Sequence, residues 1–291
     1  MDSIEIKIGR RYQNYTVEEY FLDSGIGKGR IAEIKRTNSC FVNGEPASLD
    51  YRLKIDDRIE LKFEEKINFS PCDLPLDILY EDDYLLIVNK PCGILIHPDG
   101  INVETTLANR VAAYYYSIKL FREVRYIHRI DVETTGIVLF AKDFITYSRM
   151  IKQIEDGTFE RNYLALCHHH FKTRSGIIDE PIGRDRHAPR YRVSRSLHSK
   201  RAITEYEVVK EYPKYALVKL KLSTGRTHQI RVHMSYMHHP LLGDTLYGGS
   251  KERMDRVALH SSEVRFIHPI GNEFVSVQCP LPSDMERWVK K

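Results

Sequence analysis

The sequence predicts a protein of mixed helices and strands, with a small N-terminal module followed by a larger second part. Residues 1–66 contain two short helical segments and then short strands. Residues 67–76 carry Pro71 and Pro75, which are typical of a linker. Residues 77–291 contain several strands and a few longer helices, and the total of 291 residues allows one large domain and one small one.

The composition is that of an ordinary globular protein. Apolar residues make up 42% of the chain and charged residues 29%, which is compatible with a substantial core. No apolar run approaches the ~20 residues that a membrane helix needs. The N-terminal residues show no basic region followed by an apolar one, so we expect no secretion signal and a cytoplasmic location.

Cysteine and charge patterns exclude some classes of site. The five cysteines are odd in number and no two have Cys-x-x-Cys spacing, so neither a disulfide framework nor a zinc site is indicated. The net charge of +4 is only weakly basic and does not by itself call for a nucleic-acid partner.

Periodicity and turn residues predict the elements in order. In the N-terminal module, helices at 17–22 and 30–35 are separated by the glycine-rich residues 25–29. A strand at Cys40–Val42 runs into the Asn43-Gly44 turn, and a final strand ends near Phe63. In the second part we expect the following elements: two strands around an acidic turn within 78–90, a helix from Thr105 as N-cap to Ser117, a strand at 136–141, a helix at 143–155, strands at 159–167, 202–210, 215–222, 264–267 and 273–279, and a final helix at 284–291.

The stretch from Tyr126 to Lys142 is the first candidate for chemistry. Asp131 stands on a loop directly before the apolar run 136–141, which has the character of a strand buried on both faces. A loop carboxylate on such a rigid scaffold is a position that catalytic side chains favour. The alternative is a turn or capping aspartate. Neither the spacing of a protein-kinase catalytic loop nor the Asp-Thr-Gly of an aspartic protease is present.

One dense basic tract occupies residues 183–201, with seven Lys or Arg against one acid. Arg190 and Arg192 flank Tyr191 in this tract. Charge runs are often only solvated, but unopposed charges interleaved with an aromatic residue favour an arm that follows phosphates.

A second polar stretch, residues 223–237, follows two long strands. Thr224-Gly225 predicts a turn, and we expect Arg226 to open a helix with Ile230 on its inner face. His228 and His233 are five residues apart rather than four, so they do not form a metal-binding pair on one helical face.

With these stretches side by side, the chain resembles the RluA family of pseudouridine synthases. Five segments in the family's order carry the resemblance: Lys90-Pro-Cys-Gly-Ile-Leu-Ile-His-Pro98, His128-Arg-Ile-Asp131 with Thr134-Thr-Gly136, Arg161-Asn-Tyr-Leu-Ala165, Thr224-Gly-Arg-Thr-His-Gln-Ile-Arg-Val-His233, and His239-Pro-Leu-Leu-Gly-Asp244 with Tyr247-Gly248.

The resemblance implies an α+β catalytic domain with a bent, mixed, mainly antiparallel sheet and a central cleft, at 77–291. It implies isomerisation of uridine to pseudouridine in structured RNA, with no metal and no cofactor. We therefore expect RNA as the partner, no membrane, and a monomer.

The resemblance also implies roles for individual residues. Asp131 is the expected catalytic carboxylate, Arg226 its ion-pair partner, and Tyr163 the ring stacked on uracil. Arg129 is expected to fill the space that the flipped base vacates, the alternative being a salt bridge within its own loop. We expect substrate contacts from Arg129, His128, Ile230, Arg190 and Arg192.

The N-terminal module, residues 1–66, partly resembles the RNA-binding domain named after ribosomal protein S-four. The usual Arg-Leu-Asp opening of its first helix is missing, and Val17-Glu18-Glu19 stands there. We expect RNA binding through its few basic residues, the alternative being a vestigial or packing domain; these residues are Lys28, Arg30, Lys35 and Arg36.

Large-subunit ribosomal RNA is the expected substrate, because modules of this type accompany it in the family, and transfer RNA is the alternative. A catalytically idle RNA-binding or assembly factor would need the same cleft and basic arm. It would not need Asp131, Tyr163 and Arg226, whose presence argues against this alternative. A glycoside hydrolase normally needs a second carboxylate, and none stands convincingly near Asp131.

Overall fold

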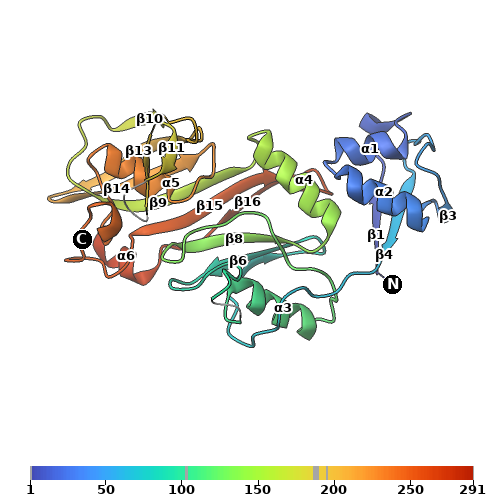
Figure 1. The fold of residues 1–291 in the computed structure, drawn as a ribbon, viewed down its shortest axis with the longest axis horizontal. Helices are drawn as coiled ribbons and strands as arrows, with labels where there is room; N and C mark the ends of the chain where they lie inside the picture. The colour runs from blue at the N-terminus through green and yellow to red at the C-terminus, as the bar shows by residue number, and fades with distance from the viewer. Residues whose placement is uncertain (1, 102–103, 186–189, 195, 291) are drawn as a thin grey trace.

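The computed structural model describes residues 2–101, 104–185, 190–194 and 196–290. It consists of a four-stranded sheet, a ten-stranded sheet and a separate two-stranded hairpin, with helices packed against them (Figure 1). No helix in these ranges is long and apolar enough to cross a membrane. The predicted α+β class is confirmed.

The N-terminal sheet is antiparallel, in the order β1-β4-β2-β3, and lies with its two helices at one end of the molecule (Figure 1). Its elements are β1 (Asp2–Lys7), η1 (Arg10–Tyr12), α1 (Val17–Asp23), α2 (Lys28–Thr37), β2 (Cys40–Val42), β3 (Glu45–Pro46) and β4 (Arg58–Phe63). Both predicted helices are confirmed. Thr16 begins α1 with a capping box, because its side chain accepts from the Glu19 N–H while Glu19 accepts from the Thr16 N–H.

The large sheet runs β10-β13-β14-β9-β15-β8-β6-β5, with β16 on β15 and β7 on β8. Its strands are β5 (Ile78–Glu81), β6 (Leu85–Lys90), β7 (Arg125–Tyr126), β8 (Thr135–Ala141), β9 (Glu160–His168), β10 (Ser175–Asp179), β13 (Ile203–Tyr212), β14 (Tyr215–Leu222), β15 (Leu259–Ile267) and β16 (Phe274–Gln278). The β15–β8 pair is parallel and the other described pairs of this sheet are antiparallel. The sheet is therefore mixed and mainly antiparallel, as predicted.

Strand β8 lies inside this sheet and is buried along its whole length, which confirms the prediction from its apolar run. Ile137 and Leu139 belong to the core cluster that contains Met150 of α4 (Phe144–Glu155). Val138 and Phe140 belong to the opposite cluster, with residues of α3 (Leu107–Ser117). Side chains alternate across a strand, so β8 needs apolar residues on both faces.

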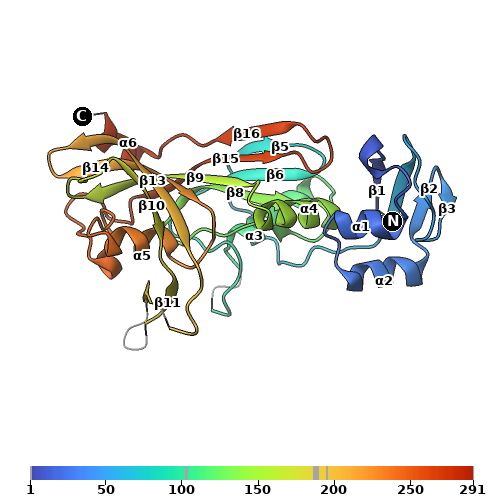
Figure 2. The same cartoon turned by 90° about the horizontal axis from the view of Figure 1, so that it is seen from above.

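The remaining elements are α5 (Gln229–Tyr236), α6 (Ser283–Val289), η2 (Thr245–Tyr247), and the hairpin of β11 (Ile182–Arg184) and β12 (Tyr191–Val193). Figure 2 shows the hairpin projecting away from the large sheet on the side where α3 and α5 lie. Two helix starts differ from the predictions. The N-cap of α3 is Thr106 rather than Thr105, because the Thr106 and Asn109 side chains form a buried capping box. Helix α5 begins at Gln229 rather than at Arg226.

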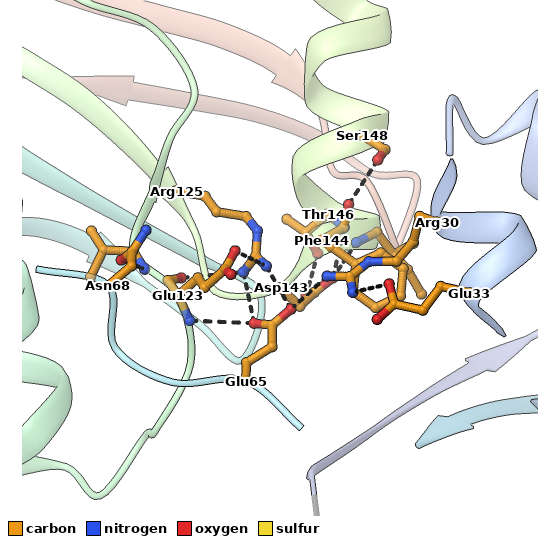
Figure 3. A network of polar contacts seen from close by, with 12 residues as sticks. Arg30, Glu33, Glu65, Asn68, Glu123, Arg125, Asp143, Phe144, Thr146 and Ser148 are labelled. Carbon is orange, nitrogen blue, oxygen red and sulfur yellow. Dashed lines mark hydrogen bonds and ion pairs between the residues drawn. The ribbon is translucent and has the colours of Figure 1, made fainter. Parts of the chain in front are cut away.

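The N-terminal sheet and its helices contact the large sheet through α4 and residues 63–68. Phe144 and Ile145 of α4 are buried within the core cluster of the N-terminal part. Figure 3 shows the Glu65 carboxylate between two arginines: Arg30 Nη2 lies 3.1 Å from it, and Arg125 Nη1 donates to it at 2.9 Å. The Glu65 side chain is only 2% exposed, so this ion-pair network is part of the buried junction.

Candidate active site

Asp131 lies on the turn between β7 and β8. Its carbonyl accepts a hydrogen bond from the Thr134 N–H at 3.1 Å, which closes the turn, and its carboxylate side chain is 24% exposed. Gly136, just beyond the turn, has a φ of +104°, and a Cβ there would lie 2.2 Å from the Ser261 carbonyl oxygen. Glycine therefore allows β8 to pair with β15 at this point, directly after the Asp131 turn.

Arg231 of α5 is the arginine that the structure places against Asp131. Its Nη1 lies 3.5 Å from Asp131 Oδ2. Its Nε and Nη2 donate to the two carboxylate oxygens of the fully buried Asp244 at 2.8 and 2.9 Å. Burial opposes the charge, but hydrogen bonding to Asp244 and the charges of Asp244, Asp131 and Glu133 outweigh it and raise the pKa of Arg231. The bidentate contact leaves the third nitrogen, Nη1, to face Asp131.

Arg226, which the sequence analysis paired with Asp131, does not make that ion pair. It lies exposed in the turn before α5, and its Nε donates to the Arg201 carbonyl at 2.9 Å. His228 takes a left-handed conformation with a φ of +55° and caps α5, so the helix starts three residues later than predicted. Arg226 therefore lies outside the helix, whereas Arg231 lies within it and contacts Asp131.

Tyr163 is buried on β9, with 4% of its surface exposed. It shares one apolar cluster with Ile230 of α5, and Ile130, next to Asp131, packs against that cluster. Burial raises the pKa of Tyr163, Arg161 opposes the rise, and the negative charge of Asp131 adds to it. The structure therefore brings together Asp131, Tyr163 and Ile230, three of the predicted site residues.

His128 and Arg129 differ sharply in position. His128 is 6% exposed and packs at 5.8 Å from the Phe159 ring, and burial together with Arg161 lowers its pKa to about 3. It is thus a neutral residue beneath the turn. Arg129 is exposed, and none of the ion pairs within the described ranges involves it. The structure thus offers no support for the alternative that Arg129 forms a salt bridge in its own loop.

The basic tract forms the β11–β12 hairpin, although its residues 186–189 and 195 lie outside the described part of the chain. Arg190 and Arg192 are about half exposed and lie 3.5 and 4.0 Å from Asp185. The Tyr191 N–H donates to the Tyr247 hydroxyl at 3.1 Å. The predicted arm is therefore attached to the segment that carries Asp244.

The Tyr247 side chain joins this hairpin to the arginine. Its ring centroid lies 5.1 Å from the Arg231 guanidinium carbon, and its hydroxyl lies 2.9 Å from His228 Nδ1. Burial lowers the pKa of His228, which favours the neutral ring beside Arg231. Sequence reasoning missed Tyr247, Asp244 and His228 as parts of the site. Asp244 and Tyr247 stood in the fifth family segment, which was the available signal.

Lys90 is a further residue whose place the sequence did not reveal. It is completely buried, and its Nζ donates to the carbonyls of Pro91, Ile94 and Val132 at 2.9, 3.1 and 3.0 Å. Burial lowers its pKa to about 8. Because Val132 follows Asp131 directly, Lys90 ties the loop after β6 to the Asp131 turn.

The arrangement can present one carboxylate, oriented by a buried arginine, to a ligand that packs against Tyr163. Within the described ranges, no group of three or more His, Cys, Asp or Glu side chains could hold a metal ion.

The chain matches the family model described as RNA pseudouridylate synthase over residues 84–236. Two Bacillus subtilis proteins, each named as an uncharacterized RNA pseudouridine synthase, are similar to it. One is 40% identical over 250 residues, covering 84% of this chain and 82% of the relative. The other is 37% identical over 281 residues, covering 94% and 98%. The Escherichia coli ribosomal large subunit pseudouridine synthase D is 35% identical over 243 residues, covering 78% and 73%.

The fold is similar to that of solved pseudouridylate synthases. The structure named human RNA pseudouridylate synthase domain containing 4 superposes with a TM-score of 0.61 at 23% identity, over 74% of this chain and 92% of that one. That likeness supports the fold alone. The family match and the relatives at 35–40% identity show that this chain is an RNA pseudouridine synthase and belongs to the RluA family.

Proposed function

We propose that this enzyme isomerises uridine in large-subunit ribosomal RNA and that Asp131 is the carboxylate that reacts at the ribose. The observation that carries the assignment of Asp131 is its ion pair with Arg231, whose other two nitrogens are committed to the buried Asp244. A fixed cation beside a carboxylate holds it in one direction.

The reaction breaks the C1′–N1 bond, turns the uracil and joins C1′ to C5, after which C5 loses its proton and N1 gains one. Asp131 can begin it in two ways, by attacking C1′ or by removing a proton from C2′. Both need an ionised carboxylate, and in both the uracil leaves with the electron pair of the broken bond. Tyr163, buried near Asp131, offers a ring against which the uracil can stack while it turns.

A uridine within structured RNA must leave its stack before it reaches Asp131, at a cost of a few kcal/mol. Arg129 is exposed two residues before Asp131, and we assign it to the space that the base vacates. A guanidinium plane can stack on the neighbouring bases while it contacts phosphate. Arg129→Ala should therefore lower activity on folded RNA more than on a short unstructured one; equal activity with the wild type on both would contradict the role.

The hairpin and the N-terminal module are the proposed contacts to the rest of the RNA. Arg190 and Arg192 project from the hairpin, and in the module Lys28, Lys35 and Arg36 of α2 are exposed. A relative named ribosomal large subunit pseudouridine synthase D supports ribosomal RNA as the substrate. Transfer RNA is the alternative. We further propose that the enzyme is a cytoplasmic monomer and that it needs no metal or cofactor.

Tritium release from RNA that carries uridine labelled at C5 tests the proposal. Wild type and Asp131→Asn would be compared on ribosomal and transfer RNA, with Asp156→Asn, an exposed position at the end of α4, as the matched control. We expect release by wild type and Asp156→Asn but none by Asp131→Asn, and faster release from ribosomal RNA. Release by Asp131→Asn would remove Asp131 from the mechanism, and faster release from transfer RNA would overturn the substrate.

A further inference from the structure

Arg161 is a buried cation to which the described part of the chain offers no hydrogen-bond or ion-pair partner. Its residue surface is 7% exposed, and none of the side-chain hydrogen bonds or ion pairs within the described ranges involves its guanidinium. Its Nε is both buried and unpaired. Buried charges are normally paired, because removing a charge from water is costly. An unpaired one in a native fold therefore calls for a functional explanation.

The guanidinium lies at the proposed active site. Arg161 and Tyr163 are two residues apart on β9, so their side chains leave the strand on the same face. A Cβ on Gly225 would lie 2.9 Å from Arg161 Nη1, so the guanidinium lies against the turn before α5, and glycine there leaves room for it. The Phe159 ring centroid is 6.0 Å from the guanidinium carbon. The charge of Arg161 acts on both neighbours, because it opposes the rise in the pKa of Tyr163 and contributes to the low pKa of His128.

We propose that Arg161 stabilises the detached uracil, which is an anion after the C1′–N1 bond breaks. This inference rests on the proposed placement of the base against Tyr163 and of the ribose at Asp131. When the bond breaks, its electron pair stays on N1 and delocalises onto the uracil O2 and O4. The negative charge of Asp131 is consumed in the same step, either in a bond to C1′ or in binding the C2′ proton. The negative charge thus moves from Asp131 to the base, beside Arg161.

This transfer explains why an unpaired cation is useful at this place. The uracil of the bound substrate is neutral, so Arg161 gains its full electrostatic partner only as the bond breaks. An interaction that strengthens from the ground state to the transition state accelerates the reaction. A permanent carboxylate partner would remove this benefit.

The depth of Arg161 favours the base over the RNA backbone as its ligand. Phosphates stay at the surface, where Arg129, Arg226 and the hairpin arginines are exposed. Arg161 instead shares its strand face with the buried ring of Tyr163. A backbone phosphate is the competing ligand, and the experiment separates the two.

Three variants test the proposal on an RNA that the wild type modifies. Arg161→Met removes the charge and keeps much of the length, Arg161→Lys keeps the charge, and Gly225→Ala leaves Arg161 in place but pushes its guanidinium aside. For Arg161→Met we expect a single-turnover rate about 100-fold below wild type, the effect of losing one transition-state donor, with RNA affinity unchanged. The single-turnover rates of Arg161→Lys and Gly225→Ala should lie between those of wild type and Arg161→Met. Weaker RNA binding with an unchanged single-turnover rate would make Arg161 a phosphate contact and overturn the proposal.

A better leaving group separates charge stabilisation from a structural role. The fluorine of 5-fluorouridine withdraws electron density and stabilises the detached base, so the ratio of wild-type to Arg161→Met rates should shrink on RNA carrying it. Nuclease digestion and chromatography would measure the loss of the starting nucleotide. An equal ratio on both RNAs would contradict the proposal.

Stability provides the last control. Removing an unpaired buried charge should keep or raise the melting temperature of Arg161→Met, whereas a packing residue would lower it. A lower melting temperature of Arg161→Met, together with a rate loss that is the same on uridine and 5-fluorouridine RNA, would show that Arg161 has a structural role only. An inactive wild type, by contrast, would refute the proposed function itself.

Discussion

Arg231 is the residue on which the geometry of the site depends most. Its side chain is 6% exposed and lies against three carboxylates: the fully buried Asp244, the partly exposed Asp131 and, at 3.9 Å, the exposed Glu133. The bond to Asp244 fixes the guanidinium plane, and the fixed plane sets where Nη1 meets Asp131. Loss of Arg231 should therefore affect both stability, through Asp244, and catalysis, through Asp131.

Two single variants, Arg231→Met and Arg226→Met, test which arginine supports stability and catalysis. Arg231→Met leaves Asp244 charged and unpaired in the core, so we expect a loss of about 3–5 kcal/mol in the free energy of unfolding and no detectable tritium release. Arg226→Met removes an exposed side chain whose Nε contacts one carbonyl, so stability should be nearly unchanged and RNA binding only weakened. Urea unfolding and tritium release measure both. Abolished chemistry in a stable, RNA-binding Arg226→Met would return the catalytic role to Arg226.

Lys90 gives a residue-scale prediction about pH. Burial lowers its pKa from 10.5 to about 8, so above pH 8 the folded protein loses this proton while the unfolded chain keeps it up to about 10.5. The unfolded state then binds more protons, and stability rises with pH in that window. The comparison is Lys90→Met, which lacks the titrating group. Wild type should gain stability relative to Lys90→Met between pH 8 and 10 in urea unfolding. A difference between the two that does not change with pH would show that the pKa is not lowered.

At the scale of elements, strands were easier to predict from sequence than the start of α5. Strand β8 is buried on both faces, so its apolar run identified it. The start of α5 depends on His228, whose φ of +55° nothing in a single sequence announces. Arg226 and Arg231 belong to the same segment, and only Arg231 lies within the helix and contacts Asp131. Ion pairs between distant segments, such as that of Arg231 with Asp131, depend on the tertiary fold and carry no local signal.

The hairpin is the element whose charge should determine the salt dependence of RNA binding. Each lost phosphate contact should flatten the plot of log affinity against log salt by about 1. We therefore expect the double variant Arg190→Gln, Arg192→Gln to lower both the affinity and this slope. The matched control is Arg287→Gln, Lys290→Gln, at the C-terminal end of α6, which loses the same charge from the opposite side of the sheet (Figure 2). Filter binding between 50 and 300 mM salt provides the measurement. An affinity loss independent of salt, or shared by the control, would indicate a misfolded hairpin or a general charge effect.

At the scale of the whole molecule, the N-terminal sheet and helices are packed against α4 rather than held only by the chain that connects them. Arg149 of α4 hydrogen-bonds to Tyr20 and Ser24, and Arg30 is committed to Glu33 and Glu65. Arg30 is therefore occupied at the junction, although the sequence placed it among the RNA-binding residues of the module. Lys28, Lys35 and Arg36 stay exposed on α2. If the module binds RNA, those three residues carry the contact in a fixed orientation relative to Asp131.

Glu65 tests whether this packing makes the molecule one cooperative unit. Glu65→Gln leaves Arg30 and Arg125 facing an uncharged amide in a buried junction, so we expect a loss of about 3 kcal/mol in the free energy of unfolding. Hydrogen exchange should then rise most in α1 and α2, because their unit can open separately from the large sheet. The control is Glu64→Gln, which removes an exposed charge one residue away. If the two variants have the same free energy of unfolding and the same hydrogen-exchange protection in α1 and α2, the Glu65 ion pairs contribute little to stability. The orientation of the module would then have to come from the RNA.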